Sequence, residues 1–427
     1  MSFVDLALFM MNMVNKTMQT EVNNFIKNVK QKPMKYGKSA MSKARVKISP
    51  ALFIDLNKGM LEDIYSDKEE IKLHHGFRII GVDGSTVALP NMEILKDKKQ
   101  SENIKEIYGK GSNQKGEYGA TPRISIMYDL ENKFVLDGIM SSIHSGERFM
   151  AVEHIDKLIE LKKNVKEDYR DLLIYDRGYP SFGLIKYHYK RGLDFLIRVD
   201  GKSSFKEIQE FTRSKKVDKI IEIEVSKYTL STLSKEKQHP NIKTLVQELK
   251  VGDKIKVRVI KVILPNGTVE VLLTSLLSEE EYPREIFKEL YFKRWGVEIG
   301  FDVIKNIFNL ENFTGLTQIA INQDFYAIIL TNNLCSLILN DVMEEKVSRY
   351  NALKKRKYLY QINRSFAIGC MKNKLVLLLQ KNVREEKIYK MIEDEIMGNL
   401  VPIKPYRSFE RKKHSSTKFP VAKKASF

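Results

Sequence analysis

One expected helix carries polar side chains whose types and spacing suit phosphate chemistry. An arginine can hold a phosphate through two parallel hydrogen bonds, a lysine acts as a point charge, and a carboxylate can bind a hard divalent cation. Steps of three, four and seven residues place all of these side chains on one side of the helix. A solvated face with ion pairs is the plain alternative, because charged helix faces are common. The four residues are Tyr291, Arg294, Glu298 and Lys305.

The helix that would position these side chains is expected to run from Pro283 to Phe308 as one continuous element. Pro283 fits the first turn of a helix, where its missing N–H costs nothing. No second proline and no paired glycines interrupt the segment. Apolar residues recur at helical spacing on another side and form a stripe that should face the core. This stripe consists of Ile286, Leu290, Val297, Phe301, Ile304 and Phe308.

The pattern Tyr-x2-Arg-x3-Glu-x6-Lys resembles, at every position, the signature of bacterial insertion-sequence transposases of the DDE type, in the Tyr-Arg-Glu-Lys (YREK) group. In this group the glutamate is the third acidic residue of a metal site on an RNase H-like, retroviral-integrase-like core. The resemblance covers roughly residues 79–330. It implies two aspartates upstream of Glu298, each at the end of a core strand.

Both aspartates are found where the resemblance implies them. An apolar strand is expected over Phe77–Pro90 and reaches Asp83, and a second, buried strand over Asp171–Tyr175 is followed by Asp176. Either aspartate alone would more often belong to a turn. Further strands are expected over residues 123–128, 133–139 and 194–199, with a helix near 150–161 and another over 181–190. This β-β-β-α-β order is the RNase H-like layout, with an aspartate after its first and fourth strands.

By this resemblance Asp83, Asp176 and Glu298 are the catalytic residues and the metal ligands. Three carboxylates form an all-oxygen site suited to Mg²⁺ or Mn²⁺, and two such ions could hold one phosphate between them. Tyr291, Arg294 and Lys305 would then contact the DNA backbone. Trp295, the only tryptophan, could stack on a displaced base; a packed core indole is the alternative. Asp302, one turn beyond Glu298, could pair with Lys305 or Arg294.

The composition favours a polyanionic partner. The formal net charge is +19, with 43% hydrophobic and 30% charged residues, and such an excess of cations is typical of proteins that bind nucleic acid. No uninterrupted apolar stretch of about 18 residues predicts a membrane span, and the N-terminal apolar segment lacks the features of a signal peptide. Cys335 and Cys370 are far apart, so neither a disulfide framework nor a structural zinc site is expected. We expect a cytoplasmic, nucleoid-associated protein.

The chain divides into five expected regions. They are a helical DNA-binding module over 1–70, a first core part over 71–200, a β-rich insertion over 201–281, a second core part over 282–340, and a helical, basic region with a tail over 341–427. In the first region, Ser39–Lys47 could be a basic helix along DNA or part of a lysine-coated bundle. In the insertion, one strand face is expected to be basic and could contact DNA; a plain half-exposed sheet is the alternative. That face would present Lys254, Lys256, Arg258 and Lys261.

The function implied by the resemblance is transposition. The protein would bind the inverted-repeat ends of its element, pair them as a homodimer, cut the double-stranded DNA and join the 3′ ends to target DNA. Two rivals remain: an RNase H-like nuclease that cuts without joining, and a catalytically silent DNA-binding protein derived from a transposase. A silent derivative would be expected to lack one of the acids, and all three are present.

Overall fold

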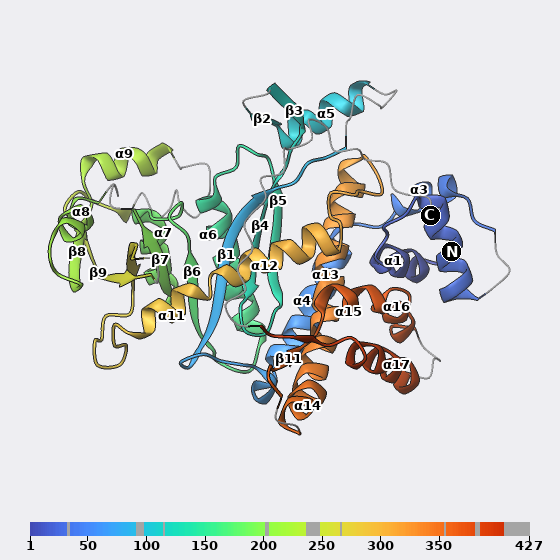
Figure 1. Ribbon diagram of the computed structural model, residues 1–427. Helices are drawn as coiled ribbons and strands as arrows, with labels where there is room; N and C mark the ends of the chain where they lie inside the picture. Colours follow the sequence, from blue (N-terminus) through green and yellow to red (C-terminus); the bar gives the residue numbers. More distant parts are fainter. Residues whose placement is uncertain are drawn as a thin grey trace.

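A mixed sheet of eight strands runs through the centre of the molecule, in the order β5-β4-β1-β6-β7-β10-β9-β8 (Figure 1). The computed structural model describes residues 1–31, 35–90, 98–113, 116–200, 205–235, 248–264, 267–353, 356–380 and 385–404. The strands are β1 (Phe77–Thr86), β4 (Arg123–Asp129), β5 (Val135–Ser141), β6 (Arg170–Tyr175), β7 (Asp194–Val199), β8 (Asp218–Glu224), β9 (Lys254–Ile263) and β10 (Val269–Thr274).

The first five strands of this order have RNase H-like connections. β1 pairs antiparallel with β4, and β4 pairs antiparallel with β5. On its other side β1 pairs parallel with β6, which pairs parallel with β7. Apart from charged residues near their ends, the central strands β6 and β7 are apolar and buried, as expected for parallel strands covered on both faces. The predicted RNase H-like core, with its β-rich insertion and helical ends, is confirmed.

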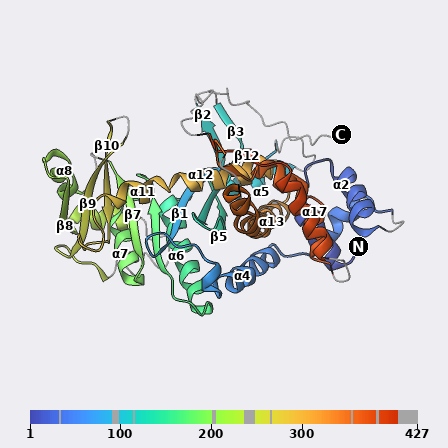
Figure 2. The same ribbon diagram turned by 60° about the horizontal axis from the view of Figure 1, so that its bottom comes forward.

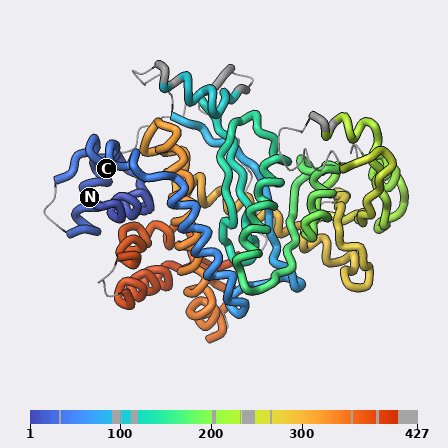
Figure 3. The backbone as a smooth tube through the Cα atoms, turned by 180° about the vertical axis from the view of Figure 1, so that it is seen from behind, coloured from blue at the N-terminus to red at the C-terminus, as the bar shows by residue number. Residues whose placement is uncertain are grey.

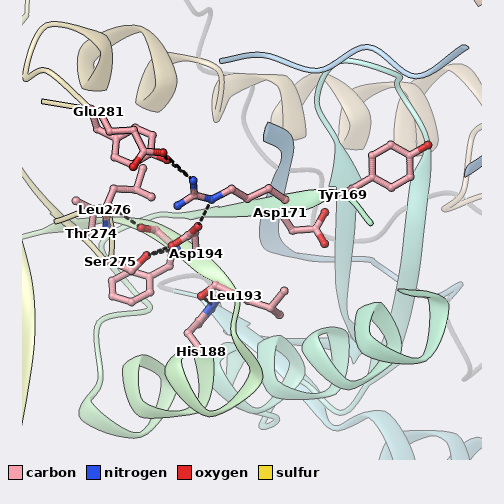
Figure 4. A network of polar contacts seen from close by, with 12 residues as sticks. Tyr169, Asp171, His188, Leu193, Asp194, Thr274, Ser275, Leu276 and Glu281 are labelled. Carbon is pink, nitrogen blue, oxygen red and sulfur yellow. Dashed lines mark hydrogen bonds and ion pairs between the residues drawn. The ribbon is translucent and has the colours of Figure 1, made fainter. Parts of the chain in front are cut away.

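The strands of the insertion continue the core sheet. β10 pairs antiparallel with β7, and β9 lies between β10 and β8. Side chains at the end of β10 strengthen the junction: the hydroxyl of Thr274 donates to the carbonyl of Phe195, and that of Ser275 donates to Asp194 at 2.8 Å. Asp194 also accepts from Arg170 (Figure 4). Residues 201–281 are therefore joined to the core by both backbone and side-chain hydrogen bonds.

The prediction of an exposed basic face on the insertion is wrong for Arg258. This side chain is 1% exposed and holds Asp218 of the adjacent strand β8 through two hydrogen bonds of 2.9 and 2.6 Å. Its third nitrogen donates to the carbonyls of Ser278 and Tyr282. Because a buried guanidinium needs such partners, Arg258 fixes the strand pair internally. Lys254 and Lys256 are exposed on the same strand.

Helices cover both faces of the sheet. The candidate helix crosses one face, where α12 packs on β1 and β4 (Figure 1), while α6 and α7 cover the opposite face (Figure 3). The crossing segment comprises α11 (Ile286–Phe292), α12 (Trp295–Asp302) and a π-helical turn, η4 (Val303–Ile307); the opposite helices are α6 (Glu147–Asn164) and α7 (Phe182–Arg191). Smaller elements at the rim and in the insertion are α5 (Lys98–Tyr108), β2 (Lys110–Asn113), β3 (Gly116–Ala120), α8 (Lys206–Arg213) and α9 (Lys227–Lys235).

The single helix predicted over 283–308 is interrupted at one turn. Lys293 and Arg294 keep helical dihedral angles, but the backbone tightens there: the amide of Arg294 donates to Tyr291 and that of Gly296 donates to Lys293, three residues back. Such a short 3₁₀-type turn often marks a functional position. The expected core-facing residues remain buried, except that Ile286 is half-buried.

Helices of the N-terminal region and described helices of the C-terminal region pack together at one side of the sheet (Figures 1 and 2). α1 contacts α13 and α16, and Phe9 and Phe25 share a hydrophobic core with Leu330 and Val376. The N-terminal elements are α1 (Phe3–Met11), α2 (Met18–Phe25), η1 (Ile26–Lys30), α3 (Lys38–Arg45), α4 (Ala51–Tyr65) and η2 (Lys68–Glu70). The C-terminal elements are α13 (Gln318–Val342), η5 (Met343–Val347), α14 (Ser348–Ala352), β11 (Tyr360–Gln361), α15 (Arg364–Met371), α16 (Lys374–Leu378), α17 (Glu385–Met397) and β12 (Val401–Pro402).

One cation of the expected DNA-facing helix near Ser39–Lys47 points inward instead. Arg45 is 4% exposed and forms an ion pair of 2.8 Å with Asp324 of α13. The same guanidinium donates to Gln323. Arg45 therefore attaches α3 to α13. The basic C-terminal tail beyond residue 404 lies outside the described residues.

A single long helical segment, Gln318–Ala352, is apolar enough by length and composition to cross a membrane, among the residues that the structure describes. Of its most apolar window, 67% is buried inside the protein. It also buries polar side chains with partners in the fold: Asn333 bonds to the backbone of Val135 and to Asn57. These contacts are those of a core helix.

Candidate active site

The three predicted acids lie at one edge of the sheet. Asp83 is near the end of β1, Asp176 directly follows β6, and Glu298 is on α12. Since β1 and β6 are parallel neighbours, their carboxyl ends meet at the same edge. α12 packs across β1, which brings the glutamate to the aspartates from a segment more than a hundred residues away in the chain.

Arg294 lies between two of these acids. Its Nη2 is 3.1 Å from Oε1 of Glu298, and its Nη1 is 3.7 Å from Oδ2 of Asp83. The residue is 4% exposed, and its guanidinium also lies over the ring of Trp295, 4.8 Å from the centroid. The tight turn at this position thus directs one buried cation into the acidic cluster.

Asp176 has partners of its own. Its Oδ1 is 2.8 Å from Nη2 of Arg198, on β7, and accepts a long hydrogen bond of 3.4 Å from the hydroxyl of Tyr291. Arg198 also pairs with Glu270 of β10 at 2.6 Å. The core strand and the first inserted strand therefore both help to place this carboxylate.

The ionisation of Asp83 is perturbed by its surroundings. Burial, with smaller contributions from the charges of Glu147 and Asp176, raises the pKa of Asp83 to about 6. The backbone amide of Gly84, which donates to Oδ1 at 2.8 Å, and the nearby Arg294 oppose this increase. The raised pKa shows that burial outweighs these two stabilising contacts of the ionised carboxylate.

Two of the predicted acids, Asp83 and Glu298, lie beside Arg294, and the third, Asp176, lies beside Arg198 and Tyr291. No set of oxygens, one from each of Asp83, Asp176 and Glu298, lies within 4.8 Å of each other in the described part of the chain. A cation that bound Asp83 and Glu298 would compete with the Arg294 guanidinium, which lies between these two carboxylates. The arrangement is therefore that of an acidic site in which an arginine supplies the positive charge.

The other predicted side chains of the helix surround the same edge. Tyr291 is 5% exposed, and the ammonium of Lys305 donates to the carbonyl of Thr86, just beyond Asp83, at 2.8 Å. The plain alternative of a solvated face is wrong for Tyr291 and Arg294, which are buried. The alternative of a core indole is also wrong, because Trp295 is 44% exposed. Asp302 accepts from Asn306.

Comparison with known proteins identifies the family of this chain. Residues 74–334, well over half of the chain, match the family model described as a transposase DDE domain. The chain belongs to this family. No curated protein matches it. Among solved structures, a cryo-EM structure of the piggyBac transposase synaptic complex with hairpin DNA is similar, at 11% identity and a TM-score of 0.37, over 79% of this chain and 60% of that one.

The transposase domain holds a fourth carboxylate at this edge that the sequence did not reveal. Glu147 begins α6, and a Cβ placed on Gly84 would lie 3.1 Å from its Oε1; one on Gly178 would lie 3.5 Å from its Oε2. Arg123 pairs with it at 3.4 Å. The two glycines that follow Asp83 and Asp176 thus leave room for the carboxylate. The strand order could have indicated this residue, because the helix that follows the third core strand must start at this edge of the sheet.

Arg198 is a second residue of this site that was not predicted from the sequence. An arginine inside the apolar strand Asp194–Val199 was the available signal. Together the site offers several carboxylates for a cation and two guanidiniums for an anion, that of the buried Arg294 and that of the half-buried Arg198. That combination suits a phosphodiester held between a metal and the protein.

Proposed function

We propose that this protein is the transposase of a bacterial insertion sequence of the YREK group. It binds the inverted-repeat ends of its element, cuts the DNA and transfers the 3′ ends to a target. The observation that carries the proposal is that Asp83, Asp176 and Glu298 lie at one edge of the sheet, at the carboxyl ends of β1 and β6, with Arg294 beside Asp83 and Glu298 and Tyr291 beside Asp176. The family membership agrees with it.

The donor set fits Mg²⁺ or Mn²⁺. Asp83, Asp176 and Glu298 offer only oxygen ligands, which hard cations prefer. The raised pKa of Asp83 reflects burial and neighbouring negative charge, and a bound cation would relieve that repulsion. These three residues would hold the metal, and the family resemblance implies two ions. When bound, such ions activate the attacking oxygen and stabilise the leaving one.

The protein's own cations would position the DNA. Nε of Arg294 and Nε of Arg198 are both buried without a hydrogen-bond partner among the described residues, so each has a donor left for a phosphate oxygen. Arg294, which contacts Asp83 and Glu298 here, could bind a phosphate bidentately if those carboxylates held a metal ion instead. Lys305 adds a point charge beside the end of β1. Tyr291, through its hydroxyl, keeps Asp176 in place.

Exposed apolar side chains beside Arg294 provide a surface for an unpaired base. Phe292 is 68% exposed, Trp295 is 44% exposed and Ile299 is 58% exposed, along one side of the same helical segment. Stacking on an aromatic ring stabilises a displaced base by about 1–3 kcal/mol. We assign Trp295 this role, with Arg294 below its ring to orient it.

The net charge of +19 supports double-stranded DNA as the partner, both element ends and target. A homodimer that pairs two ends and a cytoplasmic, nucleoid-associated location belong to the same proposal. The nuclease without joining activity and the silent derivative remain the rival functions. They differ from the proposal in what they do to DNA ends, and a single assay distinguishes them.

The test is a strand-transfer assay with labelled DNA taken from the sequences that flank the protein's own coding region. With Mg²⁺, the proposal expects specific binding, cutting and joined products. Glu298→Gln should abolish cutting and joining but leave end binding largely intact, because the side chain's shape is kept. Cut but unjoined DNA would support the nuclease, and binding without cutting would support the silent derivative. Loss of binding in Glu298→Gln would contradict the assigned role of Glu298.

A further inference from the structure

A tight turn directly before β1 brings two adjacent histidines together. His74 and Phe77 exchange backbone hydrogen bonds of 2.9 and 3.0 Å, and the two residues between them, His75 and Gly76, have positive φ angles of 48° and 77°. This is the backbone of a two-residue hairpin turn of type I′. Adjacent side chains on an extended strand would point to opposite faces. Here the left-handed conformation of His75 turns its ring back, and the ring centroids are 4.6 Å apart.

A carboxylate from α11 completes this group. Glu289 lies beside the turn, and one ligand atom from each of His74, His75 and Glu289 lies within 4.8 Å of the other two. In the described part of the chain these are the only histidine, cysteine and acidic side chains that meet in this way. His75 and Glu289 are exposed and His74 is half-buried, so water could supply a further ligand.

The contact between His74 and Glu289 is not an ordinary hydrogen bond. Nε2 of His74 is 2.9 Å from Oε1 of Glu289, yet this buried nitrogen has no partner with hydrogen-bond geometry. The ring N–H direction therefore misses the carboxylate although the two atoms are close. Two such atoms can both direct lone pairs at one cation placed beside them.

We propose that His74, His75 and Glu289 form a binding site for a transition-metal ion of the Zn²⁺ class. Two imidazoles and one carboxylate are ligands that Zn²⁺ accepts, with water at the fourth position. Imidazole ligands also favour such an ion over Mg²⁺, which prefers oxygen. This site is separate from the carboxylates at Asp83, Asp176 and Glu298, and it stands independently of the proposed function.

One nearby positive charge, that of Lys293, opposes cation binding, and an ion pair partly neutralises this charge. Lys293 lies close enough to lower the pKa of His74, after the larger effect of burial. Its ammonium pairs with Glu131 at 2.7 Å. The charge of Lys293 is therefore partly neutralised by a carboxylate that is not a ligand, and Glu289 remains beside the histidines.

A bound ion would join two elements that the candidate active site needs. The histidines precede β1, which carries Asp83, and Glu289 is on α11, two residues before Tyr291. Metal binding would thus fix the start of the crossing helix against the start of the central strand. The expected consequence is a rise in thermal stability with Zn²⁺, because the ligand set is complete only in the folded protein.

The experiment is calorimetric titration of the full-length, metal-free protein with Zn²⁺ in the presence of excess Mg²⁺. It is performed in a Glu298→Gln background as well as in the unchanged protein, so that the catalytic carboxylates and the new site are distinguished. The proposal expects one Zn²⁺ bound per chain in both. Co²⁺ bound in place of Zn²⁺ should show the visible absorption of a site with histidine ligands.

His75→Asn and Glu289→Gln are the test variants. Asparagine tolerates the left-handed backbone of the turn, so His75→Asn removes the imidazole while the fold is kept, as a circular dichroism spectrum can verify. Each variant should bind Zn²⁺ at least about tenfold more weakly, since even residues that only orient a metal ligand contribute that much. His144→Asn, at an exposed histidine outside the group, should leave the affinity unchanged. Equal affinity in all variants, or no Zn²⁺ bound at all, would overturn the proposal.

Discussion

Replacing Asp83 by asparagine should remove catalysis and at the same time stabilise the fold. The pKa of Asp83 is raised from 3.8 to about 6 by burial, with Glu147 and Asp176 adding negative charge nearby. A carboxyl with a raised pKa is harder to ionise in the folded than in the unfolded chain. The ionised aspartate therefore destabilises the folded state at neutral pH, and a neutral isostere relieves that cost.

The magnitude follows from the two pKa values. Because the folded pKa is the higher one, the folded state binds more protons between about pH 4 and pH 6, and stability falls as the pH rises through that window. Above the folded pKa the full cost applies, and a pKa change from 3.8 to about 6 corresponds to about 3 kcal/mol. The asparagine keeps an acceptor for the Gly84 amide but loses the charge contact with Arg294. We expect a net stabilisation of about 1–3 kcal/mol at pH 7.5.

Urea unfolding of both proteins between pH 5 and pH 8 without divalent metal measures this difference. The stabilisation should be constant above about pH 7 and should fall by roughly half near pH 5, where the folded carboxyl is already largely protonated. Adding Mg²⁺ at pH 7.5 should stabilise the original protein and should affect Asp83→Asn much less, since the ion binds the ionised site in the folded state.

Asp302→Asn is the matched control, because Asp302 is an exposed acid on the same helix. This substitution should change the free energy of unfolding by less than about 0.5 kcal/mol, and the change should not depend on Mg²⁺. If Asp83→Asn destabilised the protein at pH 7.5, or stabilised it equally at every pH, the reasoning about charge at this edge of the sheet would be refuted.

Three further substitutions test other parts of the account. Arg294→Ala should weaken DNA binding and lower the slope of log K against log salt by about one; an unchanged slope in a binding titration would argue against a phosphate contact. Trp295→Ala should change stability by less than about 1 kcal/mol but reduce strand transfer, and equal transfer rates would contradict base stacking. Arg258→Met should lower the free energy of unfolding by about 3–5 kcal/mol, because Asp218 is left unpaired, whereas Lys256→Met should have little effect; equal losses in urea unfolding would refute the internal role of Arg258.

The sequence predicted those parts of the fold that local pattern determines. The Tyr-Arg-Glu-Lys pattern implied an RNase H-like core by resemblance, and short apolar strands such as Asp171–Tyr175, followed by Asp176, agreed with it. Periodicity also placed the core-facing side of the crossing helix correctly. It could not show the tight turn at Arg294, because the residues there keep helical dihedral angles and only the hydrogen-bond pattern changes.

Contacts between residues far apart in the chain account for the features that the sequence did not predict. Arg258 alternates with Lys254 and Lys256 as a basic face would, but it lies beside Asp218, which is forty residues away in the chain. Arg294 was expected to face DNA, yet in the folded protein it lies between Glu298 and Asp83. The position of a buried cation depends on which carboxylates lie near it. The order of the strands in the sheet determines which carboxylates come together, and the residue pattern of one segment does not show that order.

The central claim is that Asp83, Asp176 and Glu298 together hold divalent cations beside a DNA strand. The most direct measurement is a structure of the protein bound to a DNA end with Mn²⁺, in which anomalous scattering locates the ions. The account predicts manganese within about 2–2.5 Å of an oxygen from each of the three carboxylates, with Arg294 moved onto a phosphate. Manganese located elsewhere, or Arg294 still between Glu298 and Asp83 with DNA bound, would contradict it.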